Sequence, residues 1–380
     1  MASQITNYQC PACTGPLHYA GDSGRLECEY CGSSFSVQEI EALFEEKDEA
    51  AAQAMAEEMA ETPAEESDEA PMEDETDSEG EYETSGEYWD GEAEGLRAYN
   101  CPSCGAELIM DETTAATSCP YCGNPSIIPG VFTETLKPDC IIPFKLSKDD
   151  AVKALKNYYK GKRLLPKAFA EKNHIEEIKG VYVPFWLFDG KADADISFRG
   201  TRVYTHIRGD YQYTTTEHYR VRRAGTVDFE KIPVDASSKM PDAHMDAVEP
   251  FDYRDMVDFS NAYLPGYMAN KYDVSVEECS KRADERAVNS AVSMVEQTAT
   301  GYASIVTESK RVNVHRGGVK YALLPVWMLS TRWNGQNYLF AMNGQTGKLI
   351  GDLPVDKGRF WACFAKIALP LAAIMAALLY

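Results

Sequence analysis

Eight of the eleven cysteines occur as Cys-x-x-Cys pairs, a spacing in which thiols bind metal ions or carry out redox chemistry. The pairs form two sets, and in each set 14 residues separate one pair from the next. The first set is Cys10, Cys13, Cys28 and Cys31, and the second is Cys101, Cys104, Cys119 and Cys122. Four thiolates complete a tetrahedral site, so we predict two structural Zn²⁺ ions with no open position for a catalytic water.

The residues around the cysteines favour zinc ribbons at 1–38 and 96–130. A proline follows the first cysteine in three of the four pairs, and a glycine follows the second cysteine in three. Proline presets a tight turn and glycine permits a positive φ, as a metal-binding knuckle requires. The alternative, a thioredoxin-like redox motif, expects a single pair beside a βαβ unit. Cys140, Cys279 and Cys363 are expected to act as small apolar side chains that are buried or embedded in a membrane.

The net charge of -23 comes from one segment, because residues 39–94 contain 24 Asp and Glu and only Lys47 as a base. This composition predicts a largely disordered acidic linker over 39–95. The linker could be a solvated spacer, or it could mask the basic region 144–180.

Each ribbon carries a net charge of -2. Nucleic-acid binding needs clustered Lys and Arg, so we expect the ribbons to contact proteins instead.

Residues 131–355 read as an α+β body that is rich in strands. Ser147 is expected to cap a helix that runs to about Tyr159, and Ser275 to Glu278 forms a capping box for a helix to about Gln297. Residues 191–232 contain short alternating runs broken by glycines, which predicts a meander of hairpins.

An internal echo relates two apolar strands, Val181–Phe188 and Ala322–Leu329. It suggests two related halves around one core, with Trp186 and Trp327 as matched buried anchors; the alternative is a chance similarity. Pro184 is expected to place the first strand at a sheet edge or a bulge.

No catalytic or cofactor-binding constellation is evident. The six His are dispersed, and the chain has no His-x-x-x-His, Gly-x-Ser-x-Gly or phosphate-binding loop. We therefore expect neither an enzyme nor a small-molecule substrate.

The C-terminal segment from Phe360 to Tyr380 is almost wholly apolar and would form a helix roughly 31 Å long. We predict a single transmembrane anchor at 359–380 in the cell membrane. Lys357 and Arg359 would keep the N-terminal domains in the cytoplasm. Only 14 residues follow Lys366, a length that also fits a buried or interfacial helix.

With these parts in order, the chain resembles a family of bacterial membrane-anchored zinc-ribbon proteins of Bacillus-type organisms. The residues that carry the resemblance are Cys101–Gly105, Cys119–Gly123, Tyr182–Trp186, Phe340–Lys348 and Leu353–Gly358. Members are often labelled by their ribbon as transcription-factor-B-type or helicase-like. The resemblance implies partners such as a flotillin-like scaffold or a phage-shock-protein-A-like protein in a membrane-stress system.

These features lead to one expectation of function and one alternative. We expect a membrane-anchored adaptor that docks cytoplasmic proteins at the membrane, in contact with lipid through the C-terminal helix and active in envelope stress. The alternative is a membrane-associated zinc-ribbon protein that binds nucleic acid in replication or transcription. An enzyme built on the 131–355 body has no motif behind it.

Overall fold

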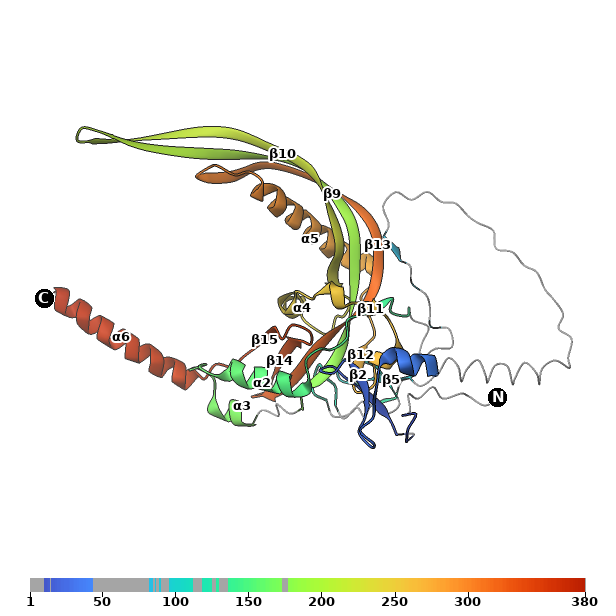
Figure 1. Ribbon diagram of the computed structural model, residues 1–380. Coiled ribbons are helices and arrows are strands. Elements are labelled where there is room, and N and C mark those ends of the chain that lie inside the picture. Colours follow the sequence, from blue (N-terminus) through green and yellow to red (C-terminus); the bar gives the residue numbers. More distant parts are fainter. Residues whose placement is uncertain are drawn as a thin grey trace, which may run out of the picture.

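The fold is described from a computed structural model (Figure 1). The described residues are 10–13, 15–43, 82–84, 86, 89, 96–111, 118–124, 128–129, 136–172 and 177–379. Most of the acidic segment predicted at 39–95 lies outside them.

The strands form one small sheet and one large sheet. The small sheet has three strands in the order β1 (Leu17–Ala20), β2 (Arg25–Cys28) and β3 (Ser34–Phe35). The large, 12-stranded sheet consists of β4 (Glu83–Thr84), β5 (Leu96–Asn100), β6 (Glu107–Asp111), β7 (Ile128–Pro129), β8 (Cys140–Ile141), β9 (Lys179–Arg208), β10 (Tyr211–Asp235), β11 (Val257–Asp258), β12 (Met268–Asn270), β13 (Ser304–Trp333), β14 (Gln336–Asn343) and β15 (Leu349–Gly351).

Three long strands, β9, β10 and β13, form a curved arm (Figure 1). The meander predicted at 191–232 is wrong, because β9 and β10 make one hairpin that turns at Gly209 and Asp210. Gly200 lies inside β9, not at a turn. A Cβ at this position would come within 2.6 Å of the Tyr302 ring, so the close approach of that ring requires a glycine.

The predicted Ser147 cap and the predicted capping box at Ser275 are both confirmed, and the structure adds a capping box at Ser147. Ser147 caps α2 (Lys148–Tyr159) and Ser275 caps α5 (Val276–Gln297), each with its third helical residue bonded back to the cap. α5 packs along the inner side of the arm, where Ala291 and Val295 join a buried cluster with strand residues (Figure 1). The other helices in the described part of the body are α3 (Lys167–Lys172), α4 (Asp242–Val248) and two 3₁₀ turns, Tyr253–Asp255 and Asn261–Tyr263.

The two echoing strand segments pair with each other. β9 runs antiparallel to β13, with Val183 opposite Leu324 at the centre and Val181 opposite Val326. The first strands of the two halves are exchanged: β8 pairs with β13, and β12 pairs with β9, both parallel. The halves β8–α2–β9–β10 and β12–α5–β13–β14 therefore interlock about a local two-fold axis.

Trp186 and Trp327 are buried and fix the exchanged helices. The Trp186 indole donates to the carbonyl of Val274, which precedes the cap of α5, at 3.0 Å. The Trp327 indole donates to the carbonyl of Leu146, which precedes the cap of α2, at 3.1 Å. Each tryptophan thus holds the start of the helix that belongs to the other half.

The edge or bulge position predicted from Pro184 is wrong, because β9 lies in the middle of the sheet and its pairing with β13 is regular at Pro184. The Pro184 carbonyl accepts a hydrogen bond from the Ala236 N–H, which follows the end of β10. The backbone edge of β9 at Pro184 thus faces the space between β10 and β12. No ladder partner on β10 or β12 stands opposite Pro184, and its missing N–H is therefore tolerated.

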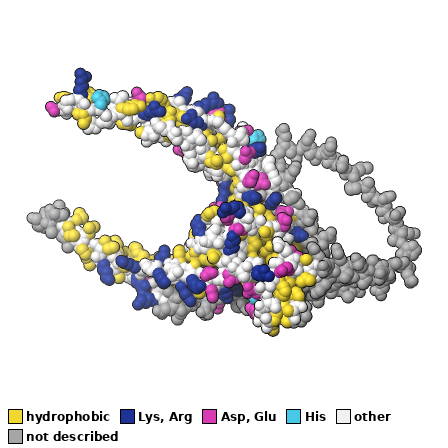
Figure 2. All heavy atoms as spheres, in the orientation of Figure 1, with side chains coloured by type: hydrophobic (Ala, Val, Ile, Leu, Met, Phe, Trp, Pro, Cys, Tyr) yellow, Lys and Arg dark blue, Asp and Glu magenta, His cyan; other side chains and the backbone are white. Residues whose placement is uncertain are grey.

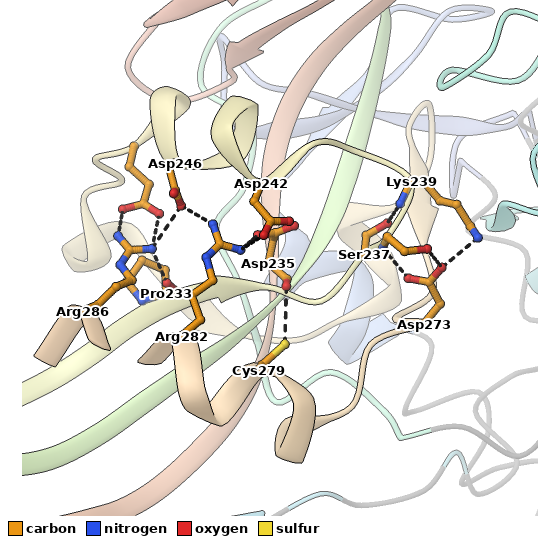
Figure 3. Close-up of polar contacts among 12 residues, drawn as sticks. Pro233, Asp235, Ser237, Lys239, Asp242, Asp246, Asp273, Cys279, Arg282 and Arg286 are labelled. Carbon is orange, nitrogen blue, oxygen red and sulfur yellow. Dashed lines mark hydrogen bonds and ion pairs between the residues drawn. The ribbon is translucent and has the colours of Figure 1, made fainter. Parts of the chain in front are cut away.

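An ion-pair network joins α4 and α5 to the end of β10 (Figure 3). Arg282 contacts the buried Asp235 at 2.6 Å and Asp246 at 2.5 Å, and Arg286 pairs with Glu249. Burial raises the pKa of the Asp235 carboxyl to about 6, although the Arg282 guanidinium opposes this shift.

The membrane span predicted at 359–380 is wrong. α6 (Lys357–Leu379) occupies this segment and shows hydrophobic side chains at the surface (Figure 2), but no helix in the described part of the chain is long and apolar enough to cross a membrane. Lys366 and Pro370 interrupt the apolar run, and the stretch of α6 after Lys366 is shorter than the about 20 residues that a span needs. The expected single-pass location, with its N-terminal domains in the cytoplasm, is wrong with it.

The indole hydrogen bonds predict a paired effect on stability. Trp186→Phe should lower the free energy of unfolding by about 1–3 kcal/mol, since it leaves the Val274 carbonyl without its donor. Trp327→Phe should do the same through Leu146. Trp361→Phe is the control, because Trp361 is 62% exposed. Urea unfolding measures all three; equal values for Trp186→Phe and Trp361→Phe would contradict the anchoring role.

The raised pKa of Asp235 predicts a pH dependence. The folded-state pKa lies above the unfolded value of about 3.9, so stability from this group is fully present below about pH 4 and is lost as pH rises through about 6. The free energy of unfolding of the wild type, relative to Asp235→Asn, should therefore fall by on the order of 2 kcal/mol over this window.

Urea unfolding of both proteins at several pH values measures the difference. Asp228→Asn is the control, because Asp228 is an exposed partner of Lys191. Parallel pH profiles for the wild type and Asp235→Asn would rule out the effect.

Candidate metal centres

The structure brings the eight predicted thiols together in two groups of four. The first group is Cys10, Cys13, Cys28 and Cys31, and the second is Cys101, Cys104, Cys119 and Cys122. The sulfur atoms of each group lie within 4.8 Å of one another. Each group could hold a metal ion.

Each group is built from two knuckles that face each other. In the first group the Cys10–Cys31 and Cys13–Cys28 sulfur pairs are both 3.5 Å apart, and in the second the corresponding distances are 3.6 Å. Four thiolates about 2.3 Å from one ion would be roughly 3.8 Å apart in a tetrahedron, close to these spacings. The donor set and the geometry therefore fit a four-coordinate metal ion.

Glycines close three of the knuckles. Gly32, Gly105 and Gly123 have φ values of 72°, 69° and 71°, the left-handed region that glycine adopts without strain. Each donates its N–H to the carbonyl of the first cysteine of its knuckle, at 2.8 to 3.0 Å. The local sequence thus bends the backbone so that both thiols of a pair point to one side.

At one sulfur of each group, Cys31 and Cys101, hydrogen-bond donors favour the thiolate form, whereas burial raises the pKa of Cys104 and Cys119. The Ser33 hydroxyl and backbone N–H lower the pKa of Cys31 to about 6. Burial acts to raise the pKa of Cys101, but the backbone N–H groups of Cys104 and Ser103 outweigh it and lower the pKa to about 7. Deprotonated sulfur is the ligand that a metal requires.

The first ribbon packs on the body through its sheet. Leu17 and Leu26 belong to the main buried cluster, and the Tyr19 N–H donates to the Pro265 carbonyl at 3.1 Å. The rings of Tyr19 and Tyr263 meet edge to face at 5.3 Å. Both knuckles expose one cysteine each, Cys13 and Cys31.

The second ribbon is part of the large sheet. β6 pairs with β12, with Ile109 opposite Ala269 and Leu108 opposite Asn270. Leu108 and Met110 are fully buried in the core that the body shares with this ribbon. The metal-binding loop Cys101–Cys104, which joins β5 to β6, is therefore fixed by the same sheet that carries the arm.

Sequence reasoning missed Lys179, which lies beside the second thiol group. Its ammonium donates to the carbonyl and hydroxyl of Ser118, the residue before Cys119. Burial lowers the pKa of Lys179, and the nearby Cys119 sulfur opposes that shift. A positive charge here offsets the negative charge of a four-thiolate site. No local pattern identifies Lys179, since 59 residues of chain separate it from Cys119.

The two groups predict the metal content of the purified protein. Elemental analysis should give about two metal ions per chain, and Cys101→Ser/Cys104→Ser should remove one of them, because two ligands are too few to hold it. Cys363→Ser is the control and should keep both ions, since Cys363 lies in neither group. Metal-free wild-type protein would contradict this assignment.

Comparison with known proteins gives one relative and no structural match. The chain is 40% identical over 233 residues to "Uncharacterized protein YdjG" of Bacillus subtilis (strain 168). The aligned part covers 61% of this chain and 68% of the relative. No family model and no solved structure matches the chain. The extent and identity of this alignment show that the chain belongs to the family of Bacillus subtilis YdjG.

Proposed function

We propose that this chain is a zinc-dependent adaptor that binds other proteins through its ribbons, and not an enzyme. The observation that carries the proposal is the donor set: among the described residues, each group consists of four thiols with no His, Asp or Glu. A Zn²⁺ ion so bound has no position left for substrate or water and acts by holding the fold. What such a site offers a partner is a rigid surface.

Zinc is the metal that this donor set favours. Soft thiolate ligands select zinc, copper(I) or iron–sulfur clusters, and four-coordinate sulfur in ribbon knuckles is the common arrangement of structural zinc. The first ribbon is too small to bury a sufficient core by itself, so its folding would depend on the ion.

Charge supports a protein partner over nucleic acid. In the first ribbon Glu29 stands next to Cys28 and Glu27 precedes it, and the exposed cysteines add thiolate charge. Arg25 is already engaged, since it pairs with Glu39 at 3.3 Å. A phosphate backbone would be repelled by this surface, because nucleic-acid affinity depends on clustered Lys and Arg.

A binding experiment tests the adaptor function. The tagged full-length protein and Cys101→Ser/Cys104→Ser would be compared at about 0.15 M salt for the proteins they recover and for binding of a fluorescent oligonucleotide. Purified flotillin-like and phage-shock-protein-A-like proteins are the first candidate partners. We expect zinc-dependent recovery of protein partners that the double variant loses, and no oligonucleotide binding.

Cys363→Ser serves as the matched cysteine control and should behave as wild type. Strong, salt-sensitive oligonucleotide binding without any protein partner would replace the adaptor with a nucleic-acid-binding protein.

A further inference from the structure

The two ribbons carry a tyrosine at the same position, two residues after the third cysteine. It is Tyr30 in the first ribbon and Tyr121 in the second. The knuckles have the same backbone, since Gly32 donates to the Cys28 carbonyl at 2.9 Å and Gly123 to the Cys119 carbonyl at 3.0 Å. The Tyr30 and Tyr121 side chains therefore project from equivalent backbone positions, and the surroundings of the two tyrosines can be compared directly.

The body covers the knuckle of the second ribbon. Tyr121 is only 6% exposed and belongs to the buried cluster that contains Met240 and Met245. Lys179 donates to the residue that precedes the knuckle, and a Cβ at Gly123 would lie 3.6 Å from the Ser330 carbonyl oxygen. This knuckle docks against an apolar site with a lysine beside it.

The equivalent knuckle of the first ribbon faces solvent. Tyr30 is 78% exposed, and among the described residues nothing lies within 4 Å of a Cβ built at Gly32. The Tyr30 ring lies over Gly15 of the facing knuckle, where a Cβ added to the glycine would come within 3.0 Å of the ring Cδ2 atom. A large aromatic side chain is thus presented to solvent at the knuckle, and exposed tyrosines of this kind are common anchors of protein interfaces.

The charges around Tyr30 determine what can cover it. Glu27 and Glu29 flank Cys28, and four thiolates around a divalent cation carry a net charge of about -2. In the second ribbon Lys179 offsets the same charge. A surface that covers the first knuckle must supply a cation in the same way.

We propose that the knuckle from Cys28 to Gly32 is a docking surface, with Tyr30 as its anchor, for a partner protein that offers an apolar pocket with a lysine or arginine beside it. The body presents this arrangement to the second ribbon. The inference rests on the proposed adaptor function and specifies where it acts. A second copy of the chain does not fit, because its own pocket is filled by Tyr121.

Site-specific cross-linking in cells tests the proposal. The full-length protein would carry a photo-reactive phenylalanine analogue at position 30 or, as a control, at position 211, because Tyr211 is also a highly exposed tyrosine, 72%, but lies at the arm tip. Mass spectrometry would locate the cross-linked peptide. We expect position 30 to cross-link one protein at an apolar surface bearing Lys or Arg, and position 211 not to reach it.

Affinity of the purified partner then gives the decisive measurement. Tyr30→Glu should weaken binding at least about tenfold, Tyr30→Phe should stay within a few-fold, and Tyr211→Glu should have no effect. All three variants should retain two metal ions per chain, because both side chains are exposed. Replacement of the partner's basic residue should weaken binding of the wild type and add little to Tyr30→Glu.

The outcomes separate this inference from the proposed function. If the wild type recovers a protein partner and Tyr30→Glu binds it equally well, the docking surface lies elsewhere and the adaptor function stands. Cross-links from position 30 to nucleic acid or to a second copy overturn the inference. If the wild type recovers no protein partner at all, both fail together.

Discussion

The antiparallel pairing of β9 with β13 is the constraint on which the rest of the structure depends. The two similar segments pair about Val183 and Leu324 and run in opposite directions. Equivalent positions of β9 and β13 therefore form equivalent contacts with their neighbouring elements. Each half then supplies the first strand and the helix that cover the other half. The tryptophan hydrogen bonds make this exchange specific, since each indole reaches the carbonyl just before a helix cap. Neither half can bury its apolar surface alone.

The two halves of the body differ in how they contact the ribbons. The outer edge of β8 pairs with β11, a short strand of the body, whereas the corresponding edge of β12 pairs with β6 of the second ribbon. One metal-binding unit is therefore a structural part of the sheet, and its knuckle is buried. The first ribbon packs through its own small sheet and leaves its knuckles outward. The same local motif thus has a structural setting in one place and an exposed setting in the other.

Local patterns predicted what local chemistry determines. Cysteine spacing identified both thiol groups, and Ser147 and Ser275 marked the two capped helices, because each depends on residues close in sequence. Local patterns failed where the role of a residue depends on packing against distant parts of the chain. Gly200 resembled a turn but makes room for Tyr302, and Pro184 resembled an edge residue but faces a space between two strands. Lys179 and the burial of Tyr121 depend on contacts that no short window of sequence contains.

The exchange between halves also determines the order in which the chain can fold during synthesis. Cys140 of β8 pairs with Ala322, so about 180 residues must leave the ribosome before β8 meets its strand. β9 and β10 can form their hairpin early, but α5, which covers it, and β13, which pairs with it, are made later. Long-range pairings of this kind slow folding and leave strand edges uncovered in the meantime. The edge of β9 that pairs with β13 therefore stays uncovered until β13 is complete, and a chain truncated before Ser304 would lack the strand that joins the two halves.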